Sequence, residues 1–359
     1  MDLLQQARKI INEVDTQMAD LFVQRMRAAE MVAQYKKAHG MPILDAEREE
    51  AVIRNGSARV QDETLRAYYI DFMRDTMAVS RQYQQRLLHG MKVAYSGTEG
   101  AFAYIAADKL FHDAEKTAYT DFKAAYNAVV NGECDAVVLP LENSYAGEVG
   151  QVTDLMFSGP LYVNHILPLS VTHDLLAVEG ATLETVKTVV SHPQALAQCD
   201  DFIRAHSYSQ TPYANTALAA KYVAELKDPA VAAIASGESA SRFGLKMLAE
   251  GINQSQVNTT RFAVLSRAEN RNVGKQHGAH FILVFTVRNE AGSLAQALNV
   301  IGSHGFNMRT LRSRPMGDLL WQYYFYVEAE GNVHSDSGRK MLEELAVYCD
   351  KIKCVGSFT

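Results

Sequence analysis

The sequence is poor in cysteine and has no long apolar run. Its four cysteines, Cys134, Cys199, Cys349 and Cys354, include no C-x-x-C pair, which indicates a reducing compartment and offers no convincing zinc or iron spacing. No apolar stretch approaches the ~20 residues of a membrane span, and the first residues lack the apolar core of a signal peptide. We therefore expect a cytoplasmic protein without a metal, a cofactor or a membrane contact.

A strong excess of charge of one sign is also missing. The chain has 35 Lys and Arg against 41 Asp and Glu, a net charge of −6, and no basic block, which argues against nucleic acid as a partner. With 359 residues, 48% of them hydrophobic, the chain can form two or three domains, each with its own core.

The first segment is free of Pro and Gly from Asp2 to Lys37. Apolar residues recur there at steps of three and four, which predicts an amphipathic helix about 54 Å long. Such a helix is longer than a small domain, so we expect it to pack against a second copy of itself. Arg25 occupies a position of the apolar stripe. Because an unpaired buried cation is costly, an anionic group should meet it.

The spacing of the cations limits which of them can contact the same ligand. Arg25 and Lys36 lie about 16 Å apart along the helix and nearly on one face, so both can reach one ligand. Arg8 lies about 25 Å from Arg25 and cannot reach that ligand within the same chain. It either contributes from a second chain or is an ordinary surface cation. A second helix is expected to begin near Asp45, and a third to run from residue 65 to 88.

These two helices add polar side chains to the cations. The second carries Arg48 and Glu49 after Asp45, and the third carries Ser80 and Gln84 on one face. The set contains cations, two carboxylates, a hydroxyl and an amide, but no obvious nucleophile. It favours a shaped electrostatic pocket over covalent catalysis.

This pattern resembles the all-helical chorismate mutases that form intertwined dimers, and the resemblance covers residues 1–90. The matching residues are Arg8, Arg25, Lys36, Asp45, Arg48, Glu49, Ser80 and Gln84. It implies that Arg25, Arg48 and Arg8 of the partner subunit bind the two carboxylates of chorismate. Lys36 and Gln84 would donate to the ether oxygen. Asp45 and Glu49 would hold the ring hydroxyl, and Ser80 a carboxylate.

The middle segment alternates predicted strands and helices. A buried strand is expected at Ala136–Leu139, breaking at Pro140, and a stretch over Tyr162–Val178 with Pro168 inside it reads as a crossover. This order predicts an α/β domain of two parallel-sheet lobes with a cleft between them. The turn after the strand Lys92–Tyr95 lacks G-x-G-x-x-G and G-K-[ST], so nucleotide binding is not expected.

Polar residues are expected at the ends of these strands. They are Glu142-Asn143-Ser144, Ser191-His192-Pro193-Gln194 with Gln198, and Asn258-Thr259-Thr260-Arg261-Phe262. Ser191 has an alternative role as the cap of the helix that begins at Pro193. His173 and His192 fit hydrogen-bonded core positions better than catalytic ones.

Together with Gly97-x-x-Gly100-Ala101-Phe102, these clusters resemble the prephenate dehydratases. The resemblance covers residues 91–269 and implies a two-lobed fold like that of periplasmic binding proteins. It implies that Thr260 assists departure of the ring hydroxyl and that Arg261 anchors a carboxylate. Asn143, Ser144, Ser191 and Gln198 would bind and orient prephenate.

The last segment, residues 279–359, follows a polar linker at 270–280. Its expected elements are the strand Phe281–Val287, the helix Ser293–His304, the strands Asn307–Arg314 and Leu320–Ala329, the helix Arg339–Tyr348 and the strand Lys351–Phe358. This βαββαβ order predicts an α+β, ferredoxin-like module. Gly292 and Leu294, with Leu311-Arg312-Ser313-Arg314-Pro315, resemble the ACT-domain motifs that bind phenylalanine between paired subunits. Arg312 stands where that family usually carries Glu.

The three motif sets occur in the order of the bifunctional chorismate mutase/prephenate dehydratases with an ACT domain, and the chain resembles that family. The resemblance implies a homodimer or larger oligomer that binds chorismate and prephenate, with phenylalanine as effector. Two alternatives stay open: a mutase fused to an arogenate dehydratase, and a non-catalytic amino-acid sensor. A fused dehydrogenase is disfavoured because the dinucleotide fingerprint is missing.

Overall fold

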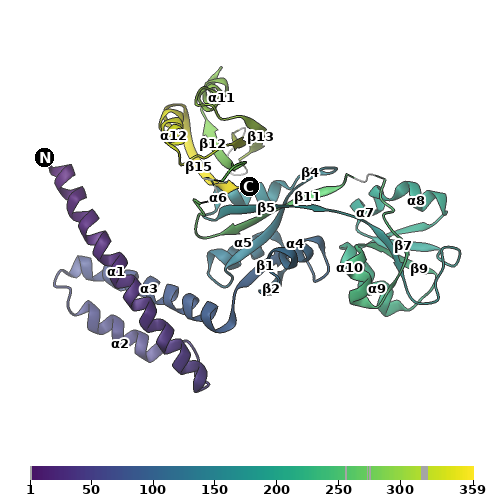
Figure 1. The fold of residues 1–359 in the computed structure, drawn as a ribbon, viewed down its shortest axis with the longest axis horizontal. Coiled ribbons are helices and arrows are strands. Elements are labelled where there is room, and N and C mark those ends of the chain that lie inside the picture. Colours follow the sequence, from purple (N-terminus) through teal and green to yellow (C-terminus); the bar gives the residue numbers. More distant parts are fainter. Residues whose placement is uncertain (1, 255–256, 273, 275, 317–321) are drawn as a thin grey trace. The chain divides into compact units, whose positions relative to one another are not determined.

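The computed structural model describes residues 2–254, 257–272, 274, 276–316 and 322–359 (Figure 1). The chain divides into two compact units, Met1–Met91 and Lys92–Thr359. Each unit is described by itself. Among the described residues, no helix combines the length and the apolar character needed to cross a bilayer.

The first unit consists of three helices, α1 (Leu3–Ala38), α2 (Ala46–Ser57) and α3 (Glu63–His89). Each begins at an aspartate whose side chain accepts a hydrogen bond from a backbone N–H of the first turn: Asp2, Asp45 and Asp62. These caps satisfy donors that the helix leaves unpaired. The predicted long first helix and the start of α2 at Asp45 are confirmed.

Much of the apolar surface of this unit is uncovered. On α1 only Met26, Ala29, Ala33 and Lys36 are buried, while Leu21 is 62% exposed and Met31 70% exposed. On α3, Tyr68 is 71% exposed. An apolar face of this extent marks a contact surface.

The second unit contains two sheets. The larger has the strand order β13-β14-β12-β15-β5-β11-β3-β1-β2, with β4 beside β3. Its strands are β1 (Lys92–Ser96), β2 (Glu115–Tyr119), β3 (Ala136–Asn143), β4 (Gly147–Glu148), β5 (Tyr162–Ser170), β11 (Thr259–Ser266), β12 (His280–Val287), β13 (Met308–Pro315), β14 (Tyr323–Glu330) and β15 (Cys349–Phe358). We call β1–β5 and β11, with α4 (Phe102–Leu110), α5 (Phe122–Val130) and α6 (Gly150–Ser158), the first lobe.

The smaller sheet, ordered β10-β6-β9-β7-β8, forms the second lobe. Its strands are β6 (Asp174–Ala177), β7 (Thr188–Ser191), β8 (Ser209–Pro212), β9 (Val231–Ala235) and β10 (Lys246–Ala249), and its helices are α7 (Pro193–Gln198), α8 (Asp200–Ala205), α9 (Thr216–Leu226) and α10 (Gly237–Phe243). The chain enters this lobe after β5 and returns to the larger sheet at β11. The predicted crossover is therefore confirmed, with Pro168 inside β5.

The expectation of two parallel sheets is wrong, because both sheets are mixed. β11 runs antiparallel to β3 and β5, and β6 runs antiparallel to β9. β6 and β11 are the strands next to the connections between the lobes. The chain leaves β5 toward the second lobe and returns from that lobe into β11, so these two neighbouring strands run in opposite directions. The pairs β1–β2, β1–β3, β7–β8 and β7–β9 are parallel as expected.

The predicted break at Pro140 is also wrong. β3 continues to Asn143, and its register with β11 shifts between Phe262↔Pro140 and Arg261↔Glu142. β1 pairs with β3 only as far as Val138, so Pro140 lies in a stretch that β1 no longer covers. A bulge of this kind accommodates a residue without an N–H. As a result Asn143 is held in the sheet.

The C-terminal module comprises β12, α11 (Ser293–Ser303), β13, β14, α12 (Asp336–Tyr348) and β15. Its strands lie in the order β13-β14-β12-β15, and each neighbouring pair is antiparallel. The predicted element order agrees, although Leu320, the expected start of the third strand, lies outside the described residues. β15 also pairs with β5 of the first lobe through Gly356 and Val163.

Both faces of the central strand β12 are buried. Phe281, Leu283 and Phe285 pack in a core with α11 and α12. The alternate residues Ile282 and Val284 pack in the core of the first lobe. The module and the first lobe therefore share a hydrophobic core.

Candidate active sites

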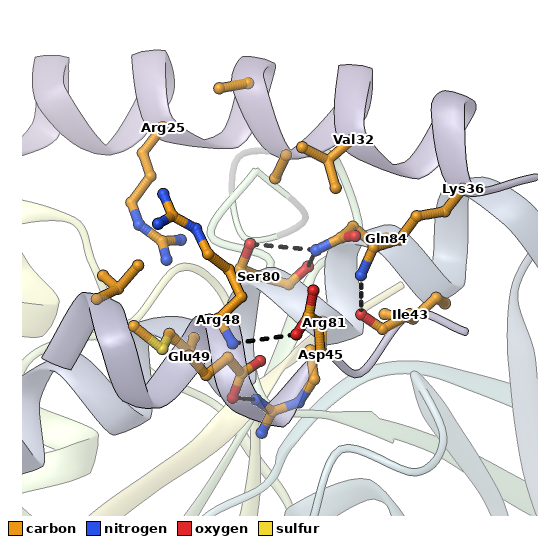
Figure 2. A pocket seen from close by; sticks show the side chains of 14 residues that line it. Arg25, Val32, Lys36, Ile43, Asp45, Arg48, Glu49, Ser80, Arg81 and Gln84 are labelled. Carbon is orange, nitrogen blue, oxygen red and sulfur yellow. Dashed lines mark hydrogen bonds and ion pairs between the residues drawn. The ribbon is translucent and has the colours of Figure 1, made fainter. Parts of the chain in front are cut away.

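A cavity of about 390 Å³ lies in the helical unit. Figure 2 shows side chains of α1 pointing toward those of α2 and α3 across it. Its polar lining consists of Arg25 and Lys36 from α1, Asp45, Arg48 and Glu49 at the start of α2, and Ser80, Arg81 and Gln84 from α3. The structure thus brings together seven of the eight predicted mutase residues.

Two cationic side chains of α1 face this cavity with few hydrogen-bond acceptors from the described residues. Arg25 Nη1 is buried and has no hydrogen-bond partner in the described part of the chain. Lys36 is only 9% exposed, and its Nζ donates to the backbone oxygen of Ile43 at 2.5 Å. Because a buried guanidinium nitrogen without a partner is costly, the cavity is suited to an anion.

Gln84 offers an amide in the same cavity and is 7% exposed. Its Nε2 donates to Ser80 O at 3.3 Å and to Ser80 Oγ at 3.5 Å, which are long bonds. Its Oε1 is buried, with no partner among the described residues. The amide can therefore exchange these contacts for a ligand at little cost.

The carboxylates of α2 are already engaged. Asp45 caps the helix by accepting from the backbone N–H of Arg48 at 3.0 Å, and Glu49 accepts from Arg81 (Figure 2). Arg81 was missed by sequence reasoning. Its place next to Ser80 and three residues before Gln84 is the signal that could have found it, because residues three apart share a helix face.

Arg8 is separate from this cavity. It lies near the start of α1 beside Gln5, Lys9 and Asn12, and it is absent from the cavity lining in the described part of the chain. This agrees with the expectation that Arg8 cannot reach the ligand of its own chain.

A second cavity, of about 420 Å³, is lined by residues of both lobes. Phe102, Phe122, Pro140, Asn143, Glu148 and Thr260 come from the first lobe, His192, Gln194 and Gln198 from the second, and His173 from the connection between them. The bulged strand β3 and the returning strand β11 supply the polar pair Asn143 and Thr260.

Backbone donors fix the orientation of the Asn143 amide. Its Oδ1 accepts from the N–H groups of Tyr145 at 3.0 Å and Ala146 at 2.9 Å. Its Nδ2 therefore donates, to Thr260 Oγ1 at 2.9 Å and to Asn258 Oδ1 at 2.8 Å. Since Thr260 accepts this bond, its own hydroxyl proton is available to a bound molecule.

A chain of hydrogen bonds from Asn143 to His173 determines which atom of His173 carries a proton. The Asn258 amide accepts from Asn143, so its Nδ2 donates to Gln198 Oε1 at 3.0 Å. Because Gln198 Oε1 is an acceptor, His173 Nε2, 2.9 Å away, carries the proton. Burial lowers the pKa of His173 and the bond to Gln198 raises it by less, so the ring is neutral at pH 7. His173 is a hydrogen-bonded residue, as expected, but it belongs to the cavity wall.

Three predicted dehydratase residues do not line the cavity in the described structure. Ser144 Oγ donates to Val257 O at 2.7 Å. Ser191 Oγ donates to Ile234 O at 2.5 Å, and the N-cap of α7 is His192, so the alternative role of Ser191 as that cap is wrong too. Arg261 binds Glu142 at 2.5 Å and Glu328 through two bonds of 3.0 Å.

The predicted effector residues do not lie together in one site. Leu294 lines a cavity of about 560 Å³ in the C-terminal module, together with Thr286, Tyr323, Phe325 and Asp350. Gly292 is the N-cap of α11, with φ of 87°, and Ser313 is exposed. Arg312 and Arg314 instead form ion pairs with the first lobe, to Glu142, Glu148 and Asp154.

One group of metal-type ligands lies away from these cavities. Potential ligand atoms of Glu269, His334 and Cys354 lie within 4.8 Å of one another. Glu269 already binds His334 Nε2 at 2.6 Å and Arg271 Nε at 3.0 Å. Its charge is therefore balanced without a cation.

Comparison with known proteins identifies the families to which the two parts of the chain belong. The chorismate mutase type II family model matches residues 7–85, and the prephenate dehydratase model matches residues 93–270. A bifunctional chorismate mutase/prephenate dehydratase of Enterobacter agglomerans is 31% identical, over 98% of this chain and 94% of that protein. An arogenate dehydratase/prephenate dehydratase of Arabidopsis thaliana is 30% identical, over 86% of this chain and 85% of that protein. The crystal structure of an Arthrobacter aurescens prephenate dehydratase in complex with L-Phe superimposes with a TM-score of 0.68 at 26% identity, over 75% of this chain and 90% of that chain.

The fold and the two cavities define an enzyme with two activities, an isomerase joined to a carbon–oxygen lyase. The chain belongs to the bifunctional chorismate mutase/prephenate dehydratase family. It rearranges chorismate to prephenate, and it converts prephenate to phenylpyruvate with loss of water and carbon dioxide.

Proposed function

We propose that the chorismate cavity works by electrostatic complementarity. Arg25, Arg48 and Arg8 of the partner subunit bind the two carboxylates, and Ser80 supports one of them. Lys36 and Gln84 donate to the ether oxygen, where negative charge accumulates as the C–O bond breaks. Asp45 and Glu49 hold the ring hydroxyl. The observation that carries this assignment is the buried Nη1 of Arg25, which has no partner among the described residues and lines the same cavity as Lys36 and Gln84.

We infer a homodimer or a larger assembly built on it, in which each mutase site is shared. The exposed apolar residues of α1 supply the contact surface, and α1, at 36 residues, is long enough to bring Arg8 of one chain to the cavity of another.

Mixing two inactive variants is expected to restore mutase activity. In a heterodimer of an Arg8→Ala chain and an Arg25→Ala chain, one site receives a wild-type Arg25 and a wild-type Arg8, while the other receives neither. Random exchange at equal amounts should then yield about a quarter of the wild-type number of sites. The chorismate rate before and after mixing measures this. Mixtures that stay as inactive as the separate variants would show that Arg8 is not shared.

For the dehydratase, we propose that Thr260 donates its free hydroxyl proton toward the departing ring hydroxyl. Asn143 holds Thr260, and the Asn258–Gln198–His173 chain holds Asn143. The apolar side chains Phe102 and Phe122 give the ring and its carboxylate a drier place, where aromatisation supplies most of the driving force. We assign no substrate contact to Arg261, Ser144 or Ser191.

Arogenate is the second candidate substrate of this site, because an Arabidopsis thaliana relative is named for both arogenate and prephenate. Arogenate carries an ammonium group where prephenate carries a keto group. Comparing kcat/KM for the two substrates shows whether arogenate is accepted as well as prephenate. The relatives that match nearly the whole chain carry the name of prephenate, so we expect kcat/KM to be higher for prephenate.

We propose three domains, at 1–90, 91–269 and 279–359, the last a ferredoxin-like ACT domain. The strand order β13-β14-β12-β15 with two helices supports this assignment. We also propose that the enzyme works in the cytoplasm and that phenylalanine is its effector. The L-Phe complex of a similar structure supports the second point.

Phenylalanine is expected to slow the dehydratase and leave the isolated mutase step unchanged. Leu294 at the first turn of α11 lines the cavity of the C-terminal module, and a helix N-terminus suits the carboxylate of an amino acid. Prephenate turnover is measured while phenylalanine is titrated, with tyrosine as a matched control. A dehydratase rate that is constant up to millimolar phenylalanine would contradict the proposal.

A further inference from the structure

The β3–β4 hairpin carries two carboxylates that oppose each other. Glu142 and Glu148 are register partners of this antiparallel pair, so their side chains lie on one face about 5 Å apart. Like charges at that spacing push the strands apart. Asn143, the residue that holds Thr260, lies in the same hairpin, and Glu148 itself lines the prephenate cavity.

Two arginines of β13 lie against these carboxylates. Arg312 binds Glu142, and its Nε lies 3.7 Å from Glu148 Oε2. Arg314 Nη1 donates to Glu148 Oε1 at 2.9 Å. Arg314 also forms two bonds to Asp154 of α6, at 2.9 Å and 2.8 Å. Arg312 thus bridges the two hairpin carboxylates, and Arg314 connects one of them, Glu148, to Asp154 of α6.

The alternation of β13 directs these two arginines to the hairpin. Arg312 and Arg314 are partly buried, whereas Arg309, Leu311 and Ser313 are exposed. Arg309 pairs with Glu330 within the C-terminal module. The strand therefore offers a natural control, because Arg309 has the same side chain and a carboxylate partner but no contact with the hairpin.

Two carboxylates of this network, Glu142 and Asp154, have a lowered pKa. Burial alone would raise the pKa of Glu142, but hydrogen bonds from Arg261 and Arg312 outweigh it, and the pKa lies below its ordinary value. Burial is likewise outweighed at Asp154 by hydrogen bonds from Arg314 and Tyr324, so its pKa is lowered. The arginines therefore favour the charged forms of Glu142 and Asp154.

We propose that Arg312 and Arg314 of the C-terminal module are positioning residues of the dehydratase, which hold the β3–β4 hairpin closed so that Asn143 can orient Thr260. The proposal rests on the role assigned above to Asn143 and Thr260. Arg314 has a second effect, since it neutralises Glu148 in the wall of a cavity that receives a dianion. The C-terminal module is then part of the catalytic apparatus even without an effector.

Replacing Arg312 by glutamine is expected to lower dehydratase kcat/KM by about 10- to 100-fold, less than the loss of one partner of a fully buried charge pair, because both side chains are partly exposed. Arg314→Gln is expected to act similarly and to raise KM as well. Arg309→Gln should retain the wild-type dehydratase rate. The chorismate rate of each full-length variant serves as an internal reference, and thermal unfolding shows whether the Lys92–Thr359 unit is intact.

A double-mutant cycle separates positioning from general damage. In a Glu148→Gln background the hairpin holds one carboxylate instead of two, so Arg312→Gln should there cost less than a third of its effect in the wild-type background. An equal cost in both backgrounds would overturn the proposal. So would Arg312→Gln and Arg314→Gln variants that turn over prephenate as fast as Arg309→Gln. If the wild-type enzyme dehydrates prephenate and the Thr260→Val variant does so at the same rate, the role of Thr260 on which the proposal rests is refuted instead.

Discussion

Arg25→Ala is expected to lower kcat/KM for chorismate by about 10²–10³-fold, the effect of truncating one partner of a desolvated charge pair. The guanidinium faces the cavity with a buried nitrogen that no described residue contacts by a hydrogen bond, so a bound carboxylate would gain a charge-assisted bond that alanine cannot offer. Prephenate turnover should stay unchanged, because the dehydratase cavity belongs to the separate unit Lys92–Thr359. Steady-state rates on each substrate measure both effects.

Arg27→Ala is the matched control for this variant. Arg27 lies two positions further along α1, is exposed, and points to the opposite side of the helix. It should keep full mutase activity. An equal loss of both activities in Arg25→Ala would refute separate sites, and a normal chorismate rate would remove Arg25 from the site.

Thr260→Val is expected to lower the dehydratase rate by about 10²–10³-fold, the range seen when one transition-state donor is removed. Valine keeps the shape of the side chain but has no hydroxyl to assist the departing group. It also removes one acceptor of the Asn143 amide, 2.9 Å away, while the bond to Asn258 Oδ1 at 2.8 Å remains. The loss should fall on kcat more than on KM, because the hydroxyl acts mainly in the transition state.

Thr259→Val is the control for the second variant. Thr259 is the neighbouring residue of β11 and faces the other side of the strand, so its hydroxyl is not expected to matter. The mutase rate should be normal in both variants. Dehydratase kinetics in Thr260→Val that match those of Thr259→Val would exclude Thr260 from catalysis.

The helical site could be predicted because its geometry is local. Helix periodicity alone relates Arg25 to Lys36 and Ser80 to Gln84, and the caps at Asp2 and Asp45 follow from residue type. Helix periodicity does not determine which residue of another helix each side chain contacts. Arg81 pairs with Glu49 from another helix, a contact that no spacing within one helix determines.

The α/β site was harder to predict because long-range contacts decide it. Arg261 follows the catalytic candidate Thr260 in the sequence, yet strand alternation turns it away, to Glu142 and Glu328. Pro140 suggested the end of a strand, but the bulge against β11 carries β3 past it. Strand propensity cannot detect such a bulge, because tertiary pairing creates it.

The arginine at position 312, where the ACT-domain motif that this segment resembles has a glutamate, has a physical explanation. A glutamate at this position would face Glu142 and Glu148 and add a third negative charge to that cluster. The arginine is consistent with a strand that docks on acidic residues of the first lobe. The sequence also indicates the contact between this module and the first lobe, because the continuous apolar run of β12 is typical of a strand buried on both faces.

The shared core has a consequence for how the chain could be shortened. Ile282, Tyr324, Tyr326 and Phe358 pack in one cluster with Met156 and Val163, and at Gly356, with φ of 145°, any side chain would collide with the backbone of Val163. A protein cut before β12 would expose this apolar surface and the edge of β5, and it would aggregate. The inhibition proposed above would therefore operate while the C-terminal module stays attached, through small shifts within a continuous sheet and not by the release of a tethered cap.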